Sequence, residues 1–246
     1  MFLLLVDVPN VRPRMLESVD LEKDFDPLPA GETGDHSLTS IPFQLVPSAL
    51  YFPNFATIEQ YQRIIEIAKA NLEPSSLALR KSETEETIKG IRTSCGTFIS
   101  ASEDKTGILD LIEEKIAKAT MIPKTHGEAF NVLLYEIGQR YQSHYDVASF
   151  LLYLSDVEES GETVFPFENG QNMDGKYDFR KCIGLKVKPL RGIGLKVKPL
   201  RGDGLLFHSL LSSVTIDLTS LHGSCPVIRG EKRVATKWIR NIEQNE

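Results

Sequence analysis

From Phe130 to the C-terminus, the sequence is a series of short runs rich in β-branched and aromatic residues, separated by Gly, Pro, Asp and Asn. The runs are FNVLLYEI, VASFLLYL, ETVFPF, GLKVKP, DGLLFHSLL and RVATKWI. Runs of this length with this punctuation are typical of strands in an antiparallel sandwich or barrel. We therefore expect a β core over residues 128–242.

Two amphipathic helices are predicted before this core, within residues 57–122. Apolar residues recur every three or four positions from Ile58 to Leu72 and again from Ile108 to Ile116, and a proline follows each segment. Helices that precede a run of strands favour an α+β fold, in which the helices pack on one face of an antiparallel sheet.

The first 40 residues mix acidic residues, prolines and glycines without an apolar period, which is typical of a flexible leader. The remainder, residues 41–246, is long enough for one sizeable core, so we expect a single domain there. The initial apolar run stops at Asp7, short of a signal-peptide core or a transmembrane span. No signal or membrane anchor is therefore visible in the sequence.

Charge and cysteine content narrow the class of partner. The net charge of -6 disfavours nucleic acid, whose binding needs clustered Lys and Arg, so a small molecule or a peptide fits better. The cysteines, Cys95, Cys182 and Cys225, have no C-x-x-C spacing, which argues against a zinc knuckle or a dithiol redox site. At most one disulfide can form, and the sequence leaves its pairing open.

An exact repeat interrupts the β-rich half: IGLKVKPLRG occupies residues 183–192 and again 193–202. Repeat architectures contain several copies that have diverged. A single perfect copy therefore indicates a recent duplication or an aberrant gene model. Only one copy can occupy a given strand of the core, and the sequence does not say which.

The stretch SHYD suggests a metal site. In an extended segment alternate side chains share a face, so His144 and Asp146 would point the same way, and His222 could complete a 2-His-1-carboxylate triad for non-haem iron(II). Taken alone, a His-x-Asp is more often a surface turn or a hydrogen-bonded histidine. Lys232, ten residues after His222, adds weight if it is buried, because a buried ammonium needs an anion such as a dicarboxylic acid. An exposed lysine at a strand end is the alternative.

Longer strings carry a family resemblance: KGIRTSCGTFISASEDKTG, IEEKIAKATMIPKTHGEAFNVLLYEIGQRYQSHYD, SFLLYLSDVEESGETVFPFENG and TSLHGSCPVIRGEKRVATKWIR. From residue 42 to the end, the sequence resembles the plant prolyl 4-hydroxylases, which are iron(II)- and 2-oxoglutarate-dependent dioxygenases. The resemblance implies a double-stranded β-helix (jelly-roll) core with the N-terminal helices packed on one face. It also implies hydroxylation of peptidyl proline to 4-hydroxyproline in proline-rich cell-wall proteins, with Fe(II), 2-oxoglutarate, O2 and L-ascorbate, in the endoplasmic reticulum or Golgi.

The resemblance also assigns roles to residues. The Fe(II) ligands would be His144, Asp146 and His222. Lys232 would pair with the C5 carboxylate of 2-oxoglutarate, beside the hydrogen-bonding neighbours Tyr135 and Thr163. Substrates would be proline-rich segments in polyproline II conformation, contacted by the aromatic side chains of Tyr141 and Trp238. For Tyr141, packing at the mouth of the barrel is an equal alternative.

One departure from the family puts activity in doubt. Family members carry on the order of fifteen residues, a functional loop, between the His-x-Asp and the next strand. Here Val147 follows Asp146 directly, and the arginine that grips the peptide in the family is absent. Either Asp146 is displaced, or the first residues of VASF form the turn. We therefore expect weak or no peptide-dependent turnover, and the alternative function is a catalytically impaired family member, or an aberrant gene model, that lacks the substrate lid.

Overall fold

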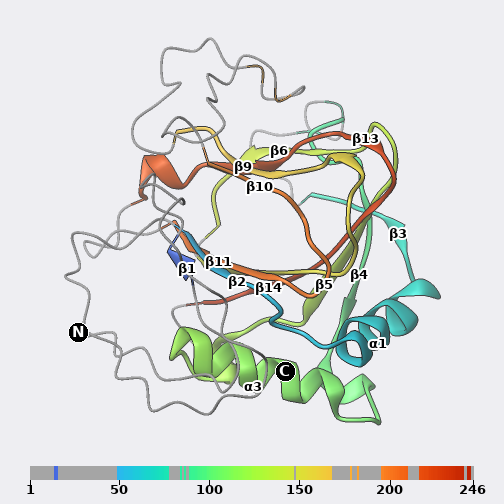
Figure 1. The fold of residues 1–246 in the computed structure, drawn as a ribbon, viewed down its shortest axis with the longest axis vertical. Helices are drawn as coiled ribbons and strands as arrows, with labels where there is room; N and C mark the ends of the chain where they lie inside the picture. Colours follow the sequence, from blue (N-terminus) through green and yellow to red (C-terminus); the bar gives the residue numbers. More distant parts are fainter. Residues whose placement is uncertain are drawn as a thin grey trace.

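The structure is a computed structural model that describes residues 14–15, 49–77, 84, 86, 89–146, 148–167, 178, 182, 195–209, 216–240 and 243–244. Within these residues, two antiparallel sheets face each other (Figure 1). The larger sheet contains, in spatial order, β1 (Arg14–Met15), β2 (Ala49–Phe52), β11 (Gly204–His208), β7 (Ala148–Tyr153), β14 (Lys232–Trp238), β5 (Phe130–Tyr135), β4 (Cys95–Ile99) and β3 (Glu73–Pro74). The smaller sheet contains β10 (Leu195–Val197), β9 (Thr163–Phe165), β12 (His222–Ser224) and β6 (Tyr141–His144). A further pair consists of β13 (Val227–Arg229) and β8 (Glu159–Ser160).

Both predicted helices form, as α1 (Ile58–Lys69) and α3 (Ile108–Thr120). They lie on the outer face of the larger sheet, away from the smaller one (Figure 1). Short 3-10 turns are η2 (Ala101–Glu103), η3 (Lys124–His126) and η5 (Leu218–Ser220). In the part of the chain that the structure describes, no helix has the length and apolar character to span a membrane. Two facing sheets with helices on one side agree with the predicted jelly-roll core.

Strands also occur before the expected β core, which was placed at residues 128–242. β4 lies between the helices in sequence and pairs along its whole length with β5. Its side chains are mostly half-buried or exposed, so it lacks the alternation of apolar and polar residues that reveals a strand. Within the expected leader, β1 pairs with β2, and the rest of residues 1–40 lies outside the described residues.

The repeated decapeptide contributes to the smaller sheet through its second copy. β10 comes from residues 193–202 and pairs with β9, whereas the first copy, 183–192, lies outside the described residues. The last residue of the second copy, Gly202, has φ +88° and sits so close to Ala56 that a Cβ would lie 2.8 Å from its carbonyl oxygen. The turn before β11 therefore requires glycine at this position.

The inner face of the larger sheet, which faces the smaller sheet, carries different side chains at its two ends. Residues directly opposite in an antiparallel pair share a face. The register places Lys232 opposite Tyr135 at one end of β14, and Trp238 opposite Ser149 at the other. Phe207 of β11 is opposite Ser149 on its other side. A buried lysine thus marks one end of the inner face and a tryptophan the other.

Candidate metal and cofactor site

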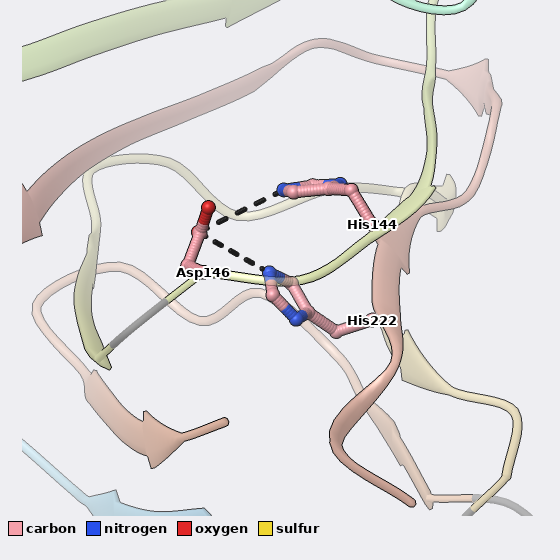
Figure 2. A group of neighbouring side chains, drawn as sticks. All are labelled: His144, Asp146 and His222. Carbon is pink, nitrogen blue, oxygen red and sulfur yellow. Dashed lines mark ion pairs between the residues drawn. The ribbon is translucent and has the colours of Figure 1, made fainter. Parts of the chain in front are cut away.

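Two imidazoles and a carboxylate converge between the sheets (Figure 2). His144 ends β6 and His222 begins β12, and the two residues are directly opposite each other in the smaller sheet. Asp146 Oδ2 lies 3.7 Å from His144 Nε2 and 3.4 Å from His222 Nε2. The ligand atoms of all three lie within 4.8 Å of one another. The three predicted metal ligands are therefore brought together.

The hydrogen bonds of the imidazoles determine which nitrogen faces the carboxylate. His144 Nδ1 is 2.9 Å from the Gln142 carbonyl oxygen, and His222 Nδ1 is 3.0 Å from that of Ser220. A carbonyl oxygen only accepts, so each Nδ1 carries the proton and donates it. A neutral ring then directs its Nε2 lone pair at Asp146. Such electron-rich atoms repel one another unless a cation lies among them, so this donor set fits a divalent metal ion.

The protonation states also fit a metal ion. Burial, reinforced by the neighbouring His222, lowers the pKa of His144 to about 4, so the ring is neutral at pH 7. Burial would raise the pKa of Asp146, but its polar surroundings, which include the two imidazoles and the hydroxyl donated by Ser149, outweigh it and hold that pKa well below its ordinary value. A neutral imidazole and an ionised carboxylate are the forms that bind metals.

Tyr141, a predicted substrate contact, packs against a predicted metal ligand. Its ring stacks on the His144 ring with centroids 3.9 Å apart and an interplanar angle of 24°. The Arg92 guanidinium lies over the Tyr141 ring, 4.9 Å from its centroid. On the other side of the site, Phe207 lies 4.3 Å from the His222 ring. These contacts fix the planes of both imidazoles, and contact of Tyr141 with substrate stays a prediction.

Trp238, the other predicted substrate contact, reaches the site through its ring nitrogen. Nε1 donates a hydrogen bond to Asp146 Oδ2 at 3.1 Å. The Trp238 ring also lies 6.0 Å from that of Phe98, which is 58% exposed. Sequence reasoning missed Phe98, because an apolar residue in a short strand gives no sign of its exposure.

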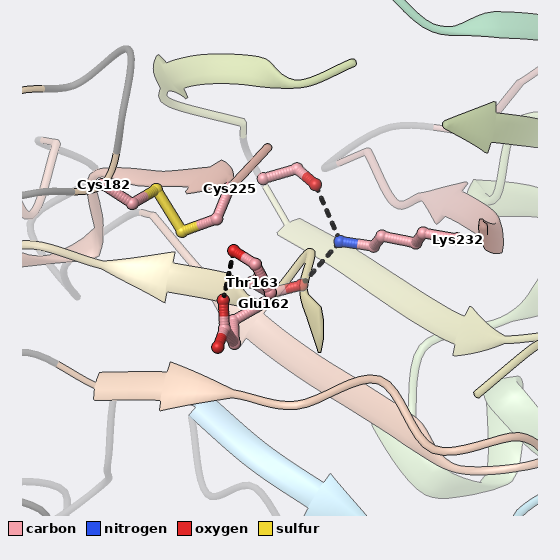
Figure 3. The surroundings of a disulfide bond; sticks show 7 residues. Glu162, Thr163, Cys182, Cys225 and Lys232 are labelled. Carbon is pink, nitrogen blue, oxygen red and sulfur yellow. Dashed lines mark hydrogen bonds between the residues drawn. A yellow bond between two sulfur atoms is a disulfide. The ribbon is translucent and has the colours of Figure 1, made fainter. Parts of the chain in front are cut away.

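Lys232 is buried at the other end of the inner face. Its Nζ donates to Ser224 Oγ at 2.8 Å and to Thr163 Oγ1 at 3.5 Å (Figure 3). Burial lowers the pKa of Lys232 to about 7, and Glu162 opposes this only partly. Among the described residues, no carboxylate forms an ion pair with this ammonium. A buried cation of this kind is complemented by an anionic ligand.

The hydroxyl groups around Lys232 are of a kind that suits an anionic ligand. Thr163 Oγ1 accepts hydrogen bonds from Tyr153 Oη at 2.8 Å and from Lys232. Its own proton, like that of Ser224, finds no acceptor in the described part of the chain and is available to a ligand. Tyr135 lies opposite Lys232, whose Nζ is 5.5 Å from the centroid of its ring. The three predicted cofactor-binding residues are therefore neighbours.

Sequence reasoning missed Ser224 and Tyr153. A signal existed for Ser224, because it is two residues after His222 in a strand and must share its face. Alternate residues of a strand are about 7 Å apart, so the predicted metal ligand His222 and the hydroxyl that accepts from Lys232 lie close together on β12. The chain then continues into Cys225, which forms a disulfide with Cys182 (Figure 3). Cys95 is a free thiol.

Comparisons with known proteins identify the family. Residues 130–240 match the 2OG-Fe(II) oxygenase superfamily. The chain is 59% identical over 264 residues to probable prolyl 4-hydroxylase 9 of Arabidopsis thaliana, covering 99% of this chain and 88% of the relative. It is 50% identical over 226 residues to prolyl 4-hydroxylase 13 of the same plant, covering 84% of this chain and 78% of the relative. The chain belongs to the plant prolyl 4-hydroxylase family.

Solved structures of similar fold agree with this prolyl 4-hydroxylase architecture. The 2OG complex of the viral collagen prolyl hydroxylase from Paramecium Bursaria Chlorella virus-1 superposes with a TM-score of 0.56 at 24% identity, covering 79% of this chain and 97% of that one. A prolyl hydroxylase from Trichoplax adhaerens, in complex with a hypoxia inducible factor peptide, gives a TM-score of 0.51 at 16% identity, covering 79% and 84%. The predicted jelly-roll fold is thereby confirmed.

Family membership also settles the cofactor class. This prolyl 4-hydroxylase is a 2-oxoglutarate-dependent dioxygenase, and its cofactors are Fe(II) and 2-oxoglutarate. The donor set of two imidazoles and a carboxylate fits the first, and the buried lysine with its hydroxyl neighbours fits the second.

The connection between β6 and β7, where a deletion is expected, is short in the fold. The alignment with probable prolyl 4-hydroxylase 9 runs over 264 residues although this chain has 246, so the relative contains residues that this chain lacks. β6 ends at His144 and β7, in the other sheet, begins at Ala148, so the crossing is short. Ala148 already pairs with β11, and Val147 lies outside the described residues. The short crossing nevertheless leaves Asp146 beside the imidazoles instead of displacing it.

Proposed function

We propose that this chain hydroxylates peptidyl proline to 4-hydroxyproline in proline-rich cell-wall proteins, with His144, Asp146 and His222 as the Fe(II) ligands and L-ascorbate as a further cofactor. The observation that carries the proposal is the convergence of two Nε2 atoms on a carboxylate, between the same two sheets that enclose a buried ammonium with no ion-pair partner among the described residues. When bound, Fe(II) with 2-oxoglutarate supplies the oxygen activation that the side chains themselves lack.

In this proposal, the lysine end of the inner face of the larger sheet binds and orients the cosubstrate. Lys232 pairs with the C5 carboxylate of 2-oxoglutarate, and the free hydroxyl protons of Thr163 and Ser224 donate to the same group. The Tyr135 ring lies beside the ammonium. Lys232, Thr163 and Tyr135 are buried, and all of these residues, Ser224 included, belong to strands. They therefore fix the position of the cosubstrate relative to His222, which shares β12 with Ser224.

The tryptophan end receives the peptide. A proline-rich segment in polyproline II conformation has no internal hydrogen bonds and docks on aromatic faces. Trp238, bonded to Asp146, and the exposed Phe98 beside it offer such faces next to the proposed metal ligands. Tyr141 lies beyond His144 and contributes a further ring at the site.

The Cys182–Cys225 disulfide supports a location in the endoplasmic reticulum or Golgi. Disulfides persist in oxidising compartments and are rare in the cytosol. Detection of this bond in protein extracted under thiol-blocking conditions tests the proposal, and two free thiols at these positions would contradict it.

A second candidate function follows from the short crossing between β6 and β7. In this alternative the chain binds Fe(II) and 2-oxoglutarate but holds no peptide, because the loop that acts as a substrate lid is missing. It predicts slow 2-oxoglutarate turnover that a peptide does not accelerate.

The deciding experiment measures succinate formation with and without a poly-proline peptide. Three proteins are compared: the chain as it stands, His144→Ala, and a version in which the corresponding segment of prolyl 4-hydroxylase 9 is inserted after Asp146 and residues 183–192 are removed. We expect weak peptide stimulation in the first, none in the second and strong stimulation in the third. Equal stimulation of the first and third would show that the lid is unnecessary. A silent third protein with unchanged iron content in His144→Ala would overturn the proposed site.

A further inference from the structure

We infer that Ser149 and Trp238 are positioning residues that hold the Asp146 carboxylate in place at the metal site. The inference rests on the proposed function, because it takes Asp146 as a metal ligand. It concerns how this chain keeps that ligand in position although the connection between β6 and β7 is short.

Asp146 differs from the two histidines in its backbone. His144 and His222 belong to paired strands, whose ladder fixes their main chain. Asp146 lies beyond the end of β6, and among the described residues its backbone makes no hydrogen bond with another backbone group. Its position therefore depends on its side-chain contacts.

Those contacts converge on one oxygen. Ser149 Oγ donates to Asp146 Oδ2 at 2.8 Å, and Trp238 Nε1 donates to the same atom at 3.1 Å. Oδ2 is also the atom that faces both imidazole Nε2 atoms. Two donors on one carboxylate oxygen restrict the rotation of the group.

The donors themselves are fixed by the larger sheet. Ser149 in β7 and Trp238 in β14 are directly opposite each other, in strands with a partner on either side. Ser149 is fully buried, and its other neighbour in the sheet is Phe207. The sheet thus presents a serine hydroxyl and an indole N–H as one preformed clamp for the carboxylate. Partners that orient a ligating carboxylate typically change metal affinity ten- to hundredfold.

The test is Co(II) titration of the full chain, followed by the visible absorption bands of the bound ion and by thermal melting of the metal-free protein. Ser149→Ala removes one donor, and Trp238→Phe removes the other while keeping an aromatic ring beside Phe98. Ser149→Thr keeps a hydroxyl. Ser155→Ala is the matched control, because this serine hydroxyl bonds only backbone groups outside the proposed metal site, donating to the Glu231 carbonyl and accepting from the Arg233 N–H.

We expect Ser149→Ala and Trp238→Phe each to weaken Co(II) binding about ten- to hundredfold and to shift its absorption bands. The double variant should lose less than the product of the single losses, because both donors act on one oxygen. Ser149→Thr should recover affinity, and Ser155→Ala should match the unchanged chain. The single tryptophan gives a second readout, because Co(II) binding beside Trp238 should quench its fluorescence.

Unchanged Co(II) affinity and spectrum in both single variants would overturn the positioning role while leaving the metal site intact. If Trp238→Phe does not fold, the comparison of Co(II) affinity between Ser149→Ala and Ser149→Thr decides whether the hydroxyl positions the carboxylate. Absence of Co(II) binding by the unchanged chain, or equal binding by His144→Ala, would overturn the proposed metal site and this inference with it.

Discussion

Lys232 donates a hydrogen bond to Ser224 Oγ across 2.8 Å, from the opposite sheet and without a carboxylate partner among the described residues. Burial holds the pKa of this ammonium at about 7, so a substantial fraction of the protein has a neutral lysine at pH 8. Binding of an anion beside it favours the charged form and raises the pKa again. We therefore expect binding of an anionic ligand at this lysine to be coupled to proton uptake.

We predict that 2-oxoglutarate binding to the Co(II)-loaded protein takes up about one proton at pH 8 and weakens as the pH rises above 7. Calorimetric titration in two buffers of different ionisation enthalpy measures the uptake. Lys232→Arg should keep the charge at all these pH values and lose the proton uptake, whereas Lys232→Met should lose most of the affinity. Binding heats that are independent of the buffer would contradict the prediction.

The His144 imidazole makes the stability of the metal-free protein depend on pH. Burial lowers its pKa to about 4 from the ordinary 6.5, so between these values the unfolded chain binds more protons than the folded one. The free energy of unfolding should then fall as the pH drops from 6.5 towards 4, by up to about 1 kcal/mol per pH unit. Urea unfolding at several pH values measures this slope. His144→Asn should flatten it, and an unchanged slope in that variant would assign the effect elsewhere.

The predictable parts of the fold were those with strong local periodicity. The helices from Ile58 and Ile108 were indicated by the spacing of their apolar residues, and the long apolar strands by their composition and the turn residues between them. β2 and β4 were missed, because the first is short and the second is largely half-exposed. The contribution of the second decapeptide copy to β10 could not be predicted, since two identical segments have identical propensities.

For the candidate site, the sequence indicated the charged and metal-binding side chains, but not the side chains that position them through hydrogen bonds. His144 and Asp146 are close in sequence, and His222 and Lys232 occur in strings that resemble the family. The Ser149 hydroxyl meets a carboxylate whose other donor, Trp238, is far away along the chain. Only the register of β7 against β14 brings these groups together, and register is set by the whole sheet.

A buried ion pair joins the sheet to the outer helix layer and offers a stability test away from the site. Lys237 of β14 bonds Glu113 of α3, and their side chains are 5% and 9% exposed. Lys237→Met should lower the free energy of unfolding by about 3–5 kcal/mol, because it leaves a buried carboxylate without a partner. The double change with Glu113→Leu should recover most of that loss, as measured by urea unfolding. A double variant less stable than the single one would contradict this account.

The Cys182–Cys225 disulfide should stabilise the fold and the segment that carries Ser224, the hydrogen-bond partner of Lys232. The bonded cysteines are 43 residues apart, and a loop of that length corresponds to about 4 kcal/mol through restriction of the unfolded chain. Because Cys225 follows Ser224, loss of the bond should also loosen the hydroxyl that accepts from Lys232 and so weaken 2-oxoglutarate binding. Thermal melting and ligand titration of the double variant Cys182→Ser/Cys225→Ser measure both effects. Cys95→Ser removes the free thiol and is the matched control, expected to change neither quantity appreciably. Equal melting temperatures for the double variant and this control would show that the disulfide contributes little to stability. Equal 2-oxoglutarate affinities would show that Ser224 keeps its position without the disulfide.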